Sequence, residues 1–252
     1  MDGNGTRSMD PKLNAGYQDL VSQFAGREVR IHFVDEPPEA QSLATYGRTL
    51  KAVARTRHRL ARAPGFLIAK PEIADRLFHA PKTRTERGRR LWAASRIALT
   101  HVLAPYLKNE TQAWAEAVMV SLAHCPGKGV ATAIRVSRGD APRLAGIGVD
   151  IEPELRTVSR KVLERIRTDD DRFGPLNSLE VWVAKEACAK ASPRPLNLSE
   201  IALKAYAGSN RLIVQAFAPS IDFRVLLLEV PHYVVALALS YPSHPYAVVS
   251  GD

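Results

Sequence analysis

Two short stretches of the sequence combine acidic and basic residues at spacings that could do chemistry. In the first, Gly148 to Pro153 (GVDIEP), Asp150 and Glu152 lie two residues apart. Residues at i and i+2 of a β-strand project from the same face, so both carboxylates would lie together. Such crowding is unfavourable unless a cation lies between the two acids. Taken alone, the pair is also typical of a strand end that shows two acids to solvent.

The second stretch runs from Trp182 to Lys190 (WVAKEACAK) and predicts a helix. Trp182, Glu186 and Lys190 recur every four residues and would share one helical face. This face would bring a carboxylate and an ammonium group together beside an aromatic ring. Taken alone, the pattern favours an ordinary surface ion pair between Glu186 and Lys190, with Trp182 in the core.

Periodicity and turn signals predict the elements that must position these stretches. The acidic pair lies on a strand over residues 147–151. The second stretch lies on a helix over residues 178–191, which Asn177 could cap, with Glu180 three residues on, and which Pro193 ends. Further strands are expected after this helix, over residues 201–206, 211–215, 223–230 and 234–239. The C-terminal half, residues 140–252, is therefore expected to be α+β.

The N-terminal half, residues 27–139, is also expected to be α+β. A strand over residues 29–34 stops at Pro37-Pro38, and a helix is expected over residues 87–106. Two strands, 118–123 and 129–136, are joined by a turn at residues 126–129. Residues 1–26, which open on a Gly, Asn and Ser-rich stretch, read as a loosely ordered N-terminal segment.

A faint internal echo links the two halves. Residues 118–134 comprise a strand, a turn containing a histidine and a second apolar strand, and residues 226–239 repeat this pattern. Two apolar hairpins can look alike by chance, so the echo alone is weak. It fits a duplicated α+β unit with a cleft between the copies.

Composition and charge limit the classes of protein. The chain has 252 residues, 46% of them hydrophobic, which is enough for a large core. We expect a cytoplasmic protein without membrane segments, because the first residues lack a signal-peptide pattern and no apolar run is long enough to span a bilayer. The two cysteines, Cys125 and Cys188, form no zinc-binding spacing.

The net charge of +9 is concentrated in one region. Residues 51–100 contain thirteen Lys or Arg against three acidic residues, a local net charge of +10. This window indicates a partner or substrate with negative charge. A solvated basic face explains the same charge equally well.

The combination of motifs is more specific than either stretch alone. The GVDIE strand, the WxxKEAxxKA helix about 30 residues later and a Ser-Leu-Ala-His turn about 25 residues upstream resemble the 4′-phosphopantetheinyl transferase superfamily, in its surfactin-type single-chain branch. The resemblance implies two similar, pseudo-duplicated α+β halves with the active site in the cleft between them. It also implies a Mg²⁺-dependent enzyme that moves the phosphopantetheine arm of coenzyme A to a serine of an acyl or peptidyl carrier protein and releases 3′,5′-ADP.

The resemblance assigns roles to residues of both motifs. Asp150, Glu152 and Glu186 correspond to the Mg²⁺ ligands. Glu186 is also the candidate base, and Lys190 corresponds to the family lysine that contacts the phosphate. The remaining assignments concern coenzyme A binding and comprise His124 at the 3′-phosphate, Lys185 as added positive field, and Arg89, Arg90 and Arg96 at the adenosine phosphate end.

The expected partners are coenzyme A and an apo carrier protein of fatty acid, polyketide or nonribosomal peptide biosynthesis, and we expect a monomer. Ala123 stands where the family usually has serine, and the Gly-Lys-Pro that commonly precedes the histidine turn is absent. A catalytically weakened family member that only binds the carrier is therefore one alternative. A basic nucleic-acid-binding protein is the other, although the basic window contains no recognition motif that we can identify.

Overall fold

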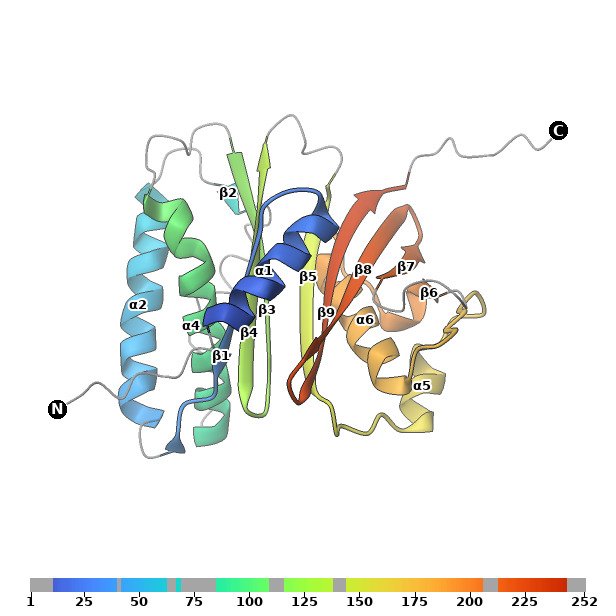
Figure 1. Ribbon diagram of the computed structural model, residues 1–252, viewed down its shortest axis with the longest axis horizontal. Helices are drawn as coiled ribbons and strands as arrows, with labels where there is room; N and C mark the ends of the chain where they lie inside the picture. Colours follow the sequence, from blue (N-terminus) through green and yellow to red (C-terminus); the bar gives the residue numbers. More distant parts are fainter. Residues whose placement is uncertain are drawn as a thin grey trace.

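The computed structural model describes residues 11–39, 42–62, 67–68, 85–108, 116–137, 144–205 and 213–243. These residues form a mixed α+β fold in which two sheets lie side by side (Figure 1). Both sheets are antiparallel, apart from one short parallel pairing in the first. No helix among the described residues is long and apolar enough to cross a membrane.

The first sheet has the strand order β1-β4-β3-β2. Its strands are β1 (Val29–Asp35), β2 (Leu67–Ile68), β3 (Glu116–Cys125) and β4 (Lys128–Ser137). Helix α4 (Glu86–Lys108) covers one face, and α2 (Ser42–Arg62) packs against α4. The buried side chains between α4 and the sheet include Leu99, Leu103, Val120 and Ala131.

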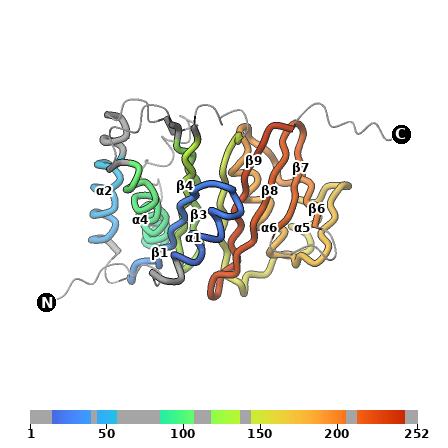
Figure 2. Tube along the Cα trace, turned by 45° about the horizontal axis from the view of Figure 1, so that its top comes forward, coloured from blue at the N-terminus to red at the C-terminus, as the bar shows by residue number. Residues whose placement is uncertain are grey.

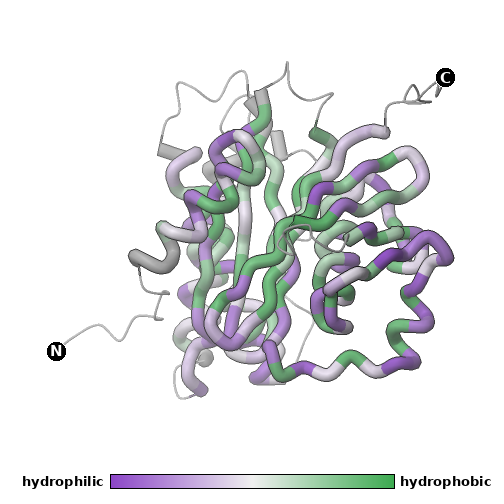
Figure 3. Tube along the Cα trace, turned by 45° about the vertical axis from the view of Figure 1, so that its right-hand side comes forward, coloured by the Kyte–Doolittle hydropathy of each residue, from purple (hydrophilic) through white to green (hydrophobic). Residues whose placement is uncertain are grey.

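The second sheet has the strand order β5-β9-β8-β7-β6. Its strands are β5 (Gly146–Pro153), β6 (Ala202–Lys204), β7 (Ile213–Ala218), β8 (Ile221–Val230) and β9 (Tyr233–Pro242). Helix α6 (Ser178–Ala191) packs on β5 and β9, while α5 (Arg160–Ile166) and the 3₁₀ turn η3 (Leu198–Glu200) lie in the connections. Hydrophobic residues are concentrated along the central strands (Figure 3).

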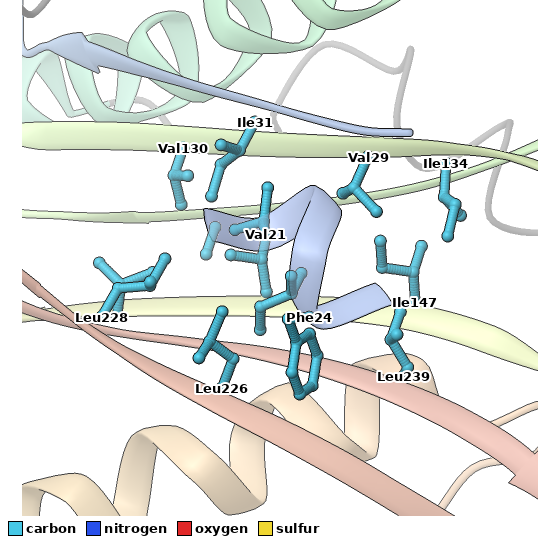
Figure 4. Packing of buried hydrophobic residues seen from close by; sticks show 14 of the residues in the cluster. Val21, Phe24, Val29, Ile31, Val130, Ile134, Ile147, Leu226, Leu228 and Leu239 are labelled. Atoms are coloured by element: carbon cyan, nitrogen blue, oxygen red, sulfur yellow. The ribbon is translucent and has the colours of Figure 1, made fainter. Parts of the chain in front are cut away.

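The sheets meet where β3 contacts β5. The Val149 amide of β5 donates a hydrogen bond to Ser121 Oγ of β3 at 3.0 Å. Helix α1 (Pro11–Ala25) covers this junction, and Val21 and Phe24 lie among side chains of both sheets (Figures 2 and 4). Burial of each such side chain contributes roughly 1.5–3 kcal/mol. The junction is therefore part of the main core, which holds β3 and β5 in a fixed relation.

Most predicted elements are confirmed to within a few residues, including β1, α4, β3, β4, β5 and α6. The expectation of a loosely ordered segment through residue 26 is wrong for Pro11–Ala25, which is helical. The helix ends where Gly26 adopts a φ of 64°, a left-handed conformation that favours glycine. Residues 1–10 and the predicted boundary between residues 139 and 140 lie outside the described residues.

Candidate active site

The site is built where α6 runs against β5. A Cβ on Gly148 would lie 2.0 Å from the Ala187 carbonyl oxygen, so only glycine lets the helix backbone approach the strand this closely. This approach brings Lys190 to Asp150, and the lysine Nζ donates a hydrogen bond to Asp150 Oδ1 at 2.7 Å. The side chain of Asp150 is only 9% exposed, so its charge is largely removed from water.

Asp150 lies close enough to Glu186 for its negative charge to disfavour ionisation of Glu186. Burial raises the pKa of Asp150, although the Lys190 ammonium opposes this shift. Burial also raises the pKa of Glu186, and the negative charge of Asp150 raises it further. Asp150 Oδ2 is buried and has no hydrogen-bond partner among the described residues. The two carboxylates therefore form a site that a cation would stabilise.

Glu152 lies on the same face of β5 and forms an ion pair with Arg156. The chain turns back between them, because the Arg156 amide donates to the Pro153 carbonyl at 2.9 Å. The Arg156 guanidinium carbon lies 5.1 Å from the centre of the Trp182 ring, a cation–π distance. The indole Nε1 of Trp182 is buried and has no hydrogen-bond partner in the part of the chain that is described. Arg156 thus joins the strand motif to the helix motif.

The three predicted metal ligands, Asp150, Glu152 and Glu186, are not arranged around a common point that would coordinate a metal ion. No group of three His, Cys, Asp or Glu side chains among the described residues is arranged to hold a metal ion. Lys190 and Arg156 neutralise two of the three carboxylates instead. The donor set still fits Mg²⁺, because all three ligands supply oxygen and the buried Asp150 Oδ2 lacks a partner.

His124 of β3 and Arg96 of α4 face the same region from the first half. The side chain of His124 is exposed, yet the pKa is lowered by partial desolvation and then by the positive charges of Arg96 and Lys190. Burial lowers the pKa of Arg96 to about 10, so the guanidinium still carries its charge near neutral pH. Arg96 of α4 and Lys190 of α6 therefore place positive charge around His124 of β3, and Lys190 also contacts Asp150.

Arg89 and Arg90, predicted from the sequence to contribute to coenzyme A binding, also lie on α4. Arg90 Nε lies 2.9 Å from a carboxylate oxygen of Glu36, whose other oxygen accepts the Gly127 amide at 2.8 Å. Arg90 therefore helps Glu36 to hold the turn between β3 and β4. Arg89 is half-buried on α4.

The sequence predicts a role for Lys185 in coenzyme A binding, and the structure contradicts this prediction. Its side chain is fully buried, and its Nζ lies 2.8 Å from Asp171 Oδ2 and 2.6 Å from the Ile166 carbonyl oxygen. On a helix, neighbouring residues point about 100° apart, so Lys185 faces the loop after α5 while Glu186 faces β5. This correction assigns Lys185 to the core.

A cavity of about 720 Å³ lies beside Arg156. Its walls come from the start of α6, the turn between β8 and β9, and Tyr17 of α1. The lining includes apolar side chains, among them Leu227, Val230 and Val234. None of the three predicted metal ligands lines it, so Arg156 is its link to the carboxylates.

A second titratable pair lies between β1 and α4, outside this site. The rings of His32 and His101 stack with their centres 4.4 Å apart. Burial and, to a smaller extent, the nearby His101 together lower the pKa of His32 to about 4. Burial also lowers the pKa of His101. The pair is therefore neutral and packed near neutral pH.

Comparison with known proteins gives no family for this chain. No model of a known protein family matches the sequence. A search of curated proteins likewise finds no similar sequence. The resemblance to phosphopantetheinyl transferases thus rests on the quoted motifs, and the function follows as a proposal.

Proposed function

We propose that this protein is a Mg²⁺-dependent 4′-phosphopantetheinyl transferase that modifies a serine of an acyl or peptidyl carrier protein. The observation that carries the proposal is the approach of Asp150, Glu186 and Lys190 across the junction of β5 and α6. Arg96 supplies positive charge to the same area from the first half, and His124 lies beside it with a lowered pKa that favours the neutral imidazole. A site of crowded carboxylates rimmed by cations suits a metal bound to a diphosphate.

The two halves support a duplicated origin with the active site between them. In each half the first strand pairs with the last strand of a hairpin, as β1 pairs with β4 and β5 with β9. Each hairpin also turns through proline and one residue of positive φ, at Pro126-Gly127 and at Pro231-His232. The proposed site draws residues from both halves, which agrees with a site at their junction.

The metal would be held by Asp150, Glu152 and Glu186. Mg²⁺ supplies charge neutralisation and polarisation of the diphosphate when bound. Around it, His124 and Arg96 would bind the 3′-phosphate end of coenzyme A, and Lys190 would contact the diphosphate. The cavity beside Arg156 offers apolar walls to the pantetheine arm.

Glu186 is the proposed base for the carrier serine. Its raised pKa makes its carboxylate a better proton acceptor than an exposed glutamate. The serine hydroxyl would pass its proton to a Glu186 oxygen while its own oxygen bonds to the β-phosphorus. The bond from that phosphorus to the bridging oxygen breaks, and 3′,5′-ADP leaves with this oxygen. Cytoplasmic location and a monomeric state belong to the same proposal.

A transfer assay tests the proposal directly. The full-length protein is incubated with coenzyme A, Mg²⁺ and a panel of apo carrier proteins, and each carrier is weighed by mass spectrometry. An added phosphopantetheine arm on at least one carrier supports the proposal. Carrier binding without any mass gain would favour the weakened, binding-only alternative. If no carrier is bound or modified, the proposed function is wrong.

A further inference from the structure

Glu152 and Asp150 each form an ion pair with a basic side chain of the same chain. Arg156 pairs with Glu152, and Lys190 pairs with Asp150. Both carboxylates are strongly shielded, with 13% and 9% of their side chains exposed. Two of the three carboxylates of the proposed metal site are therefore each paired with a cationic side chain.

Arg156 is placed to leave this pair without unfolding. It follows the turn after β5, 39% of its side chain is exposed, and it lines the neighbouring cavity. Its guanidinium rests on the Trp182 ring, whose buried Nε1 has no partner among the described residues. A guanidinium also binds phosphate oxygens through two parallel hydrogen bonds, as well as it binds a carboxylate.

We propose that Arg156 is a mobile counter-ion: it neutralises Glu152 in the metal-free protein and transfers to a phosphate of the substrate when a divalent cation takes Glu152. This inference rests on the proposed function. One consequence is an order of binding: the divalent cation binds before the diphosphate, since the diphosphate gains its Arg156 contact only after the metal has displaced Arg156 from Glu152. Another is competition, since Arg156 opposes metal binding in the absence of substrate.

The competition gives an unusual prediction for Arg156→Met, which keeps an apolar stem on Trp182 and removes the charge. We expect this variant to bind Mg²⁺ about threefold to tenfold more tightly than the wild type, as measured by calorimetry without coenzyme A. At saturating Mg²⁺ it should bind coenzyme A about tenfold more weakly. Arg160→Met is the matched control, because Arg160 is 92% exposed and pairs with Glu164 on α5. Both affinities should stay at the wild-type value in that variant.

Trp182 provides a readout that does not depend on transfer. We expect Mg²⁺ to change the tryptophan fluorescence of the wild type, and Trp182→Phe, which leaves Trp92 and Trp114, to remove most of the change. Glu152→Gln should release Arg156 in advance and give a signal that no longer responds to Mg²⁺. Unchanged or weaker Mg²⁺ binding by Arg156→Met would overturn the inference even if the wild type transfers the arm. If the Mg²⁺ and fluorescence results are as expected but the wild type transfers the arm to no carrier, only the proposed function is overturned.

Discussion

Lys185 and Asp171 form an ion pair 2.8 Å long in which neither side chain exposes any surface. Asp171 also accepts the backbone amides of Thr168 and Leu203, at 2.7 Å each. The carboxylate thus ties the loop after α5 and strand β6 to the helix that carries Glu186. A buried pair of this kind is costly to leave half broken.

Lys185→Met should therefore destabilise the protein strongly. The variant leaves the Asp171 carboxylate buried without its cation, which costs about 3–5 kcal/mol. Urea unfolding measures the loss. Arg160→Met is the comparison, because Arg160 and its partner Glu164 are 92% and 61% exposed and loss of this pair should cost far less stability. Equal losses in the two variants would contradict the structural role of Lys185.

Glu186→Gln should stabilise the metal-free protein while it abolishes transfer. Burial and Asp150 raise the pKa of Glu186 in the fold, so its protonated form is favoured there. Its contribution to stability is then full below the unfolded pKa of about 4.3 and is lost as the pH rises through the higher folded pKa. The glutamine side chain does not ionise, so near pH 7 the variant does not lose this stability. It should therefore unfold at a higher urea concentration than the wild type. A midpoint below that of the wild type would contradict the crowding of the two acids.

His124→Ala should weaken coenzyme A binding about tenfold, because a charge-assisted bond to phosphate contributes about 1.5–3 kcal/mol. Dephospho-coenzyme A, which lacks the 3′-phosphate, serves as the control ligand. The wild type should discriminate between the two ligands more strongly than the variant, in which Arg96 remains. Undiminished discrimination would make His124 a structural residue of the hairpin.

The stacked pair His32 and His101 should make the protein sensitive to acid. The pKa of His32 is about 4 in the fold, against about 6.5 in the unfolded chain. The unfolded state therefore binds the proton first, and the free energy of unfolding should fall as the pH drops from 6.5 towards 4. Urea unfolding of His32→Phe should show a shallower dependence over this range.

The basic region should speed the encounter with an acidic carrier. Arg87 is exposed in the first turn of α4, whereas Arg84 lies outside the described residues. Arg87→Glu should lower kcat/KM for the carrier but leave kcat and coenzyme A binding unchanged, because long-range attraction acts on encounter. Added salt should have the same effect, since charges are screened over about 8 Å. A value of kcat/KM that ignores both changes would leave the arginines as a solvated face.

The sequence predicted best where local signals agree with one another. Helix α6 begins and ends at the predicted residues, since Asn177 and Glu180 form a capping box and Pro193 follows the last turn. Helix α1 was missed because its buried residues, such as Val21 and Phe24, stand among many polar ones. Its stability comes from packing on both sheets, which a local pattern does not encode.

The site shows the same limit. Asp150 lies on a strand and Lys190 on a helix, and periodicity predicts which face of each element carries the residue. The structure shows that these two faces meet and that the two side chains pair. The role of Arg156 depends on a turn that folds it back on Glu152 and on a ring from another element. Lys185 precedes Glu186 in the sequence, so its charge was assigned to coenzyme A binding. Its ion pair with Asp171, a loop residue distant in sequence, shows that Lys185 is buried in the core instead.

The hydrogen bond from Tyr17 of α1 to the Glu229 carbonyl of β8 joins residues 212 positions apart. Helix α1 leaves the ribosome long before β8 and β9, yet its docking surface is complete only after these strands have been synthesised. Its apolar side therefore stays unpacked against the second sheet until β8 and β9 have emerged. Contacts of such sequence separation slow folding, so docking of α1 is expected to be a late step. Refolding monitored at Tyr17 should lag behind formation of the β3–β4 hairpin.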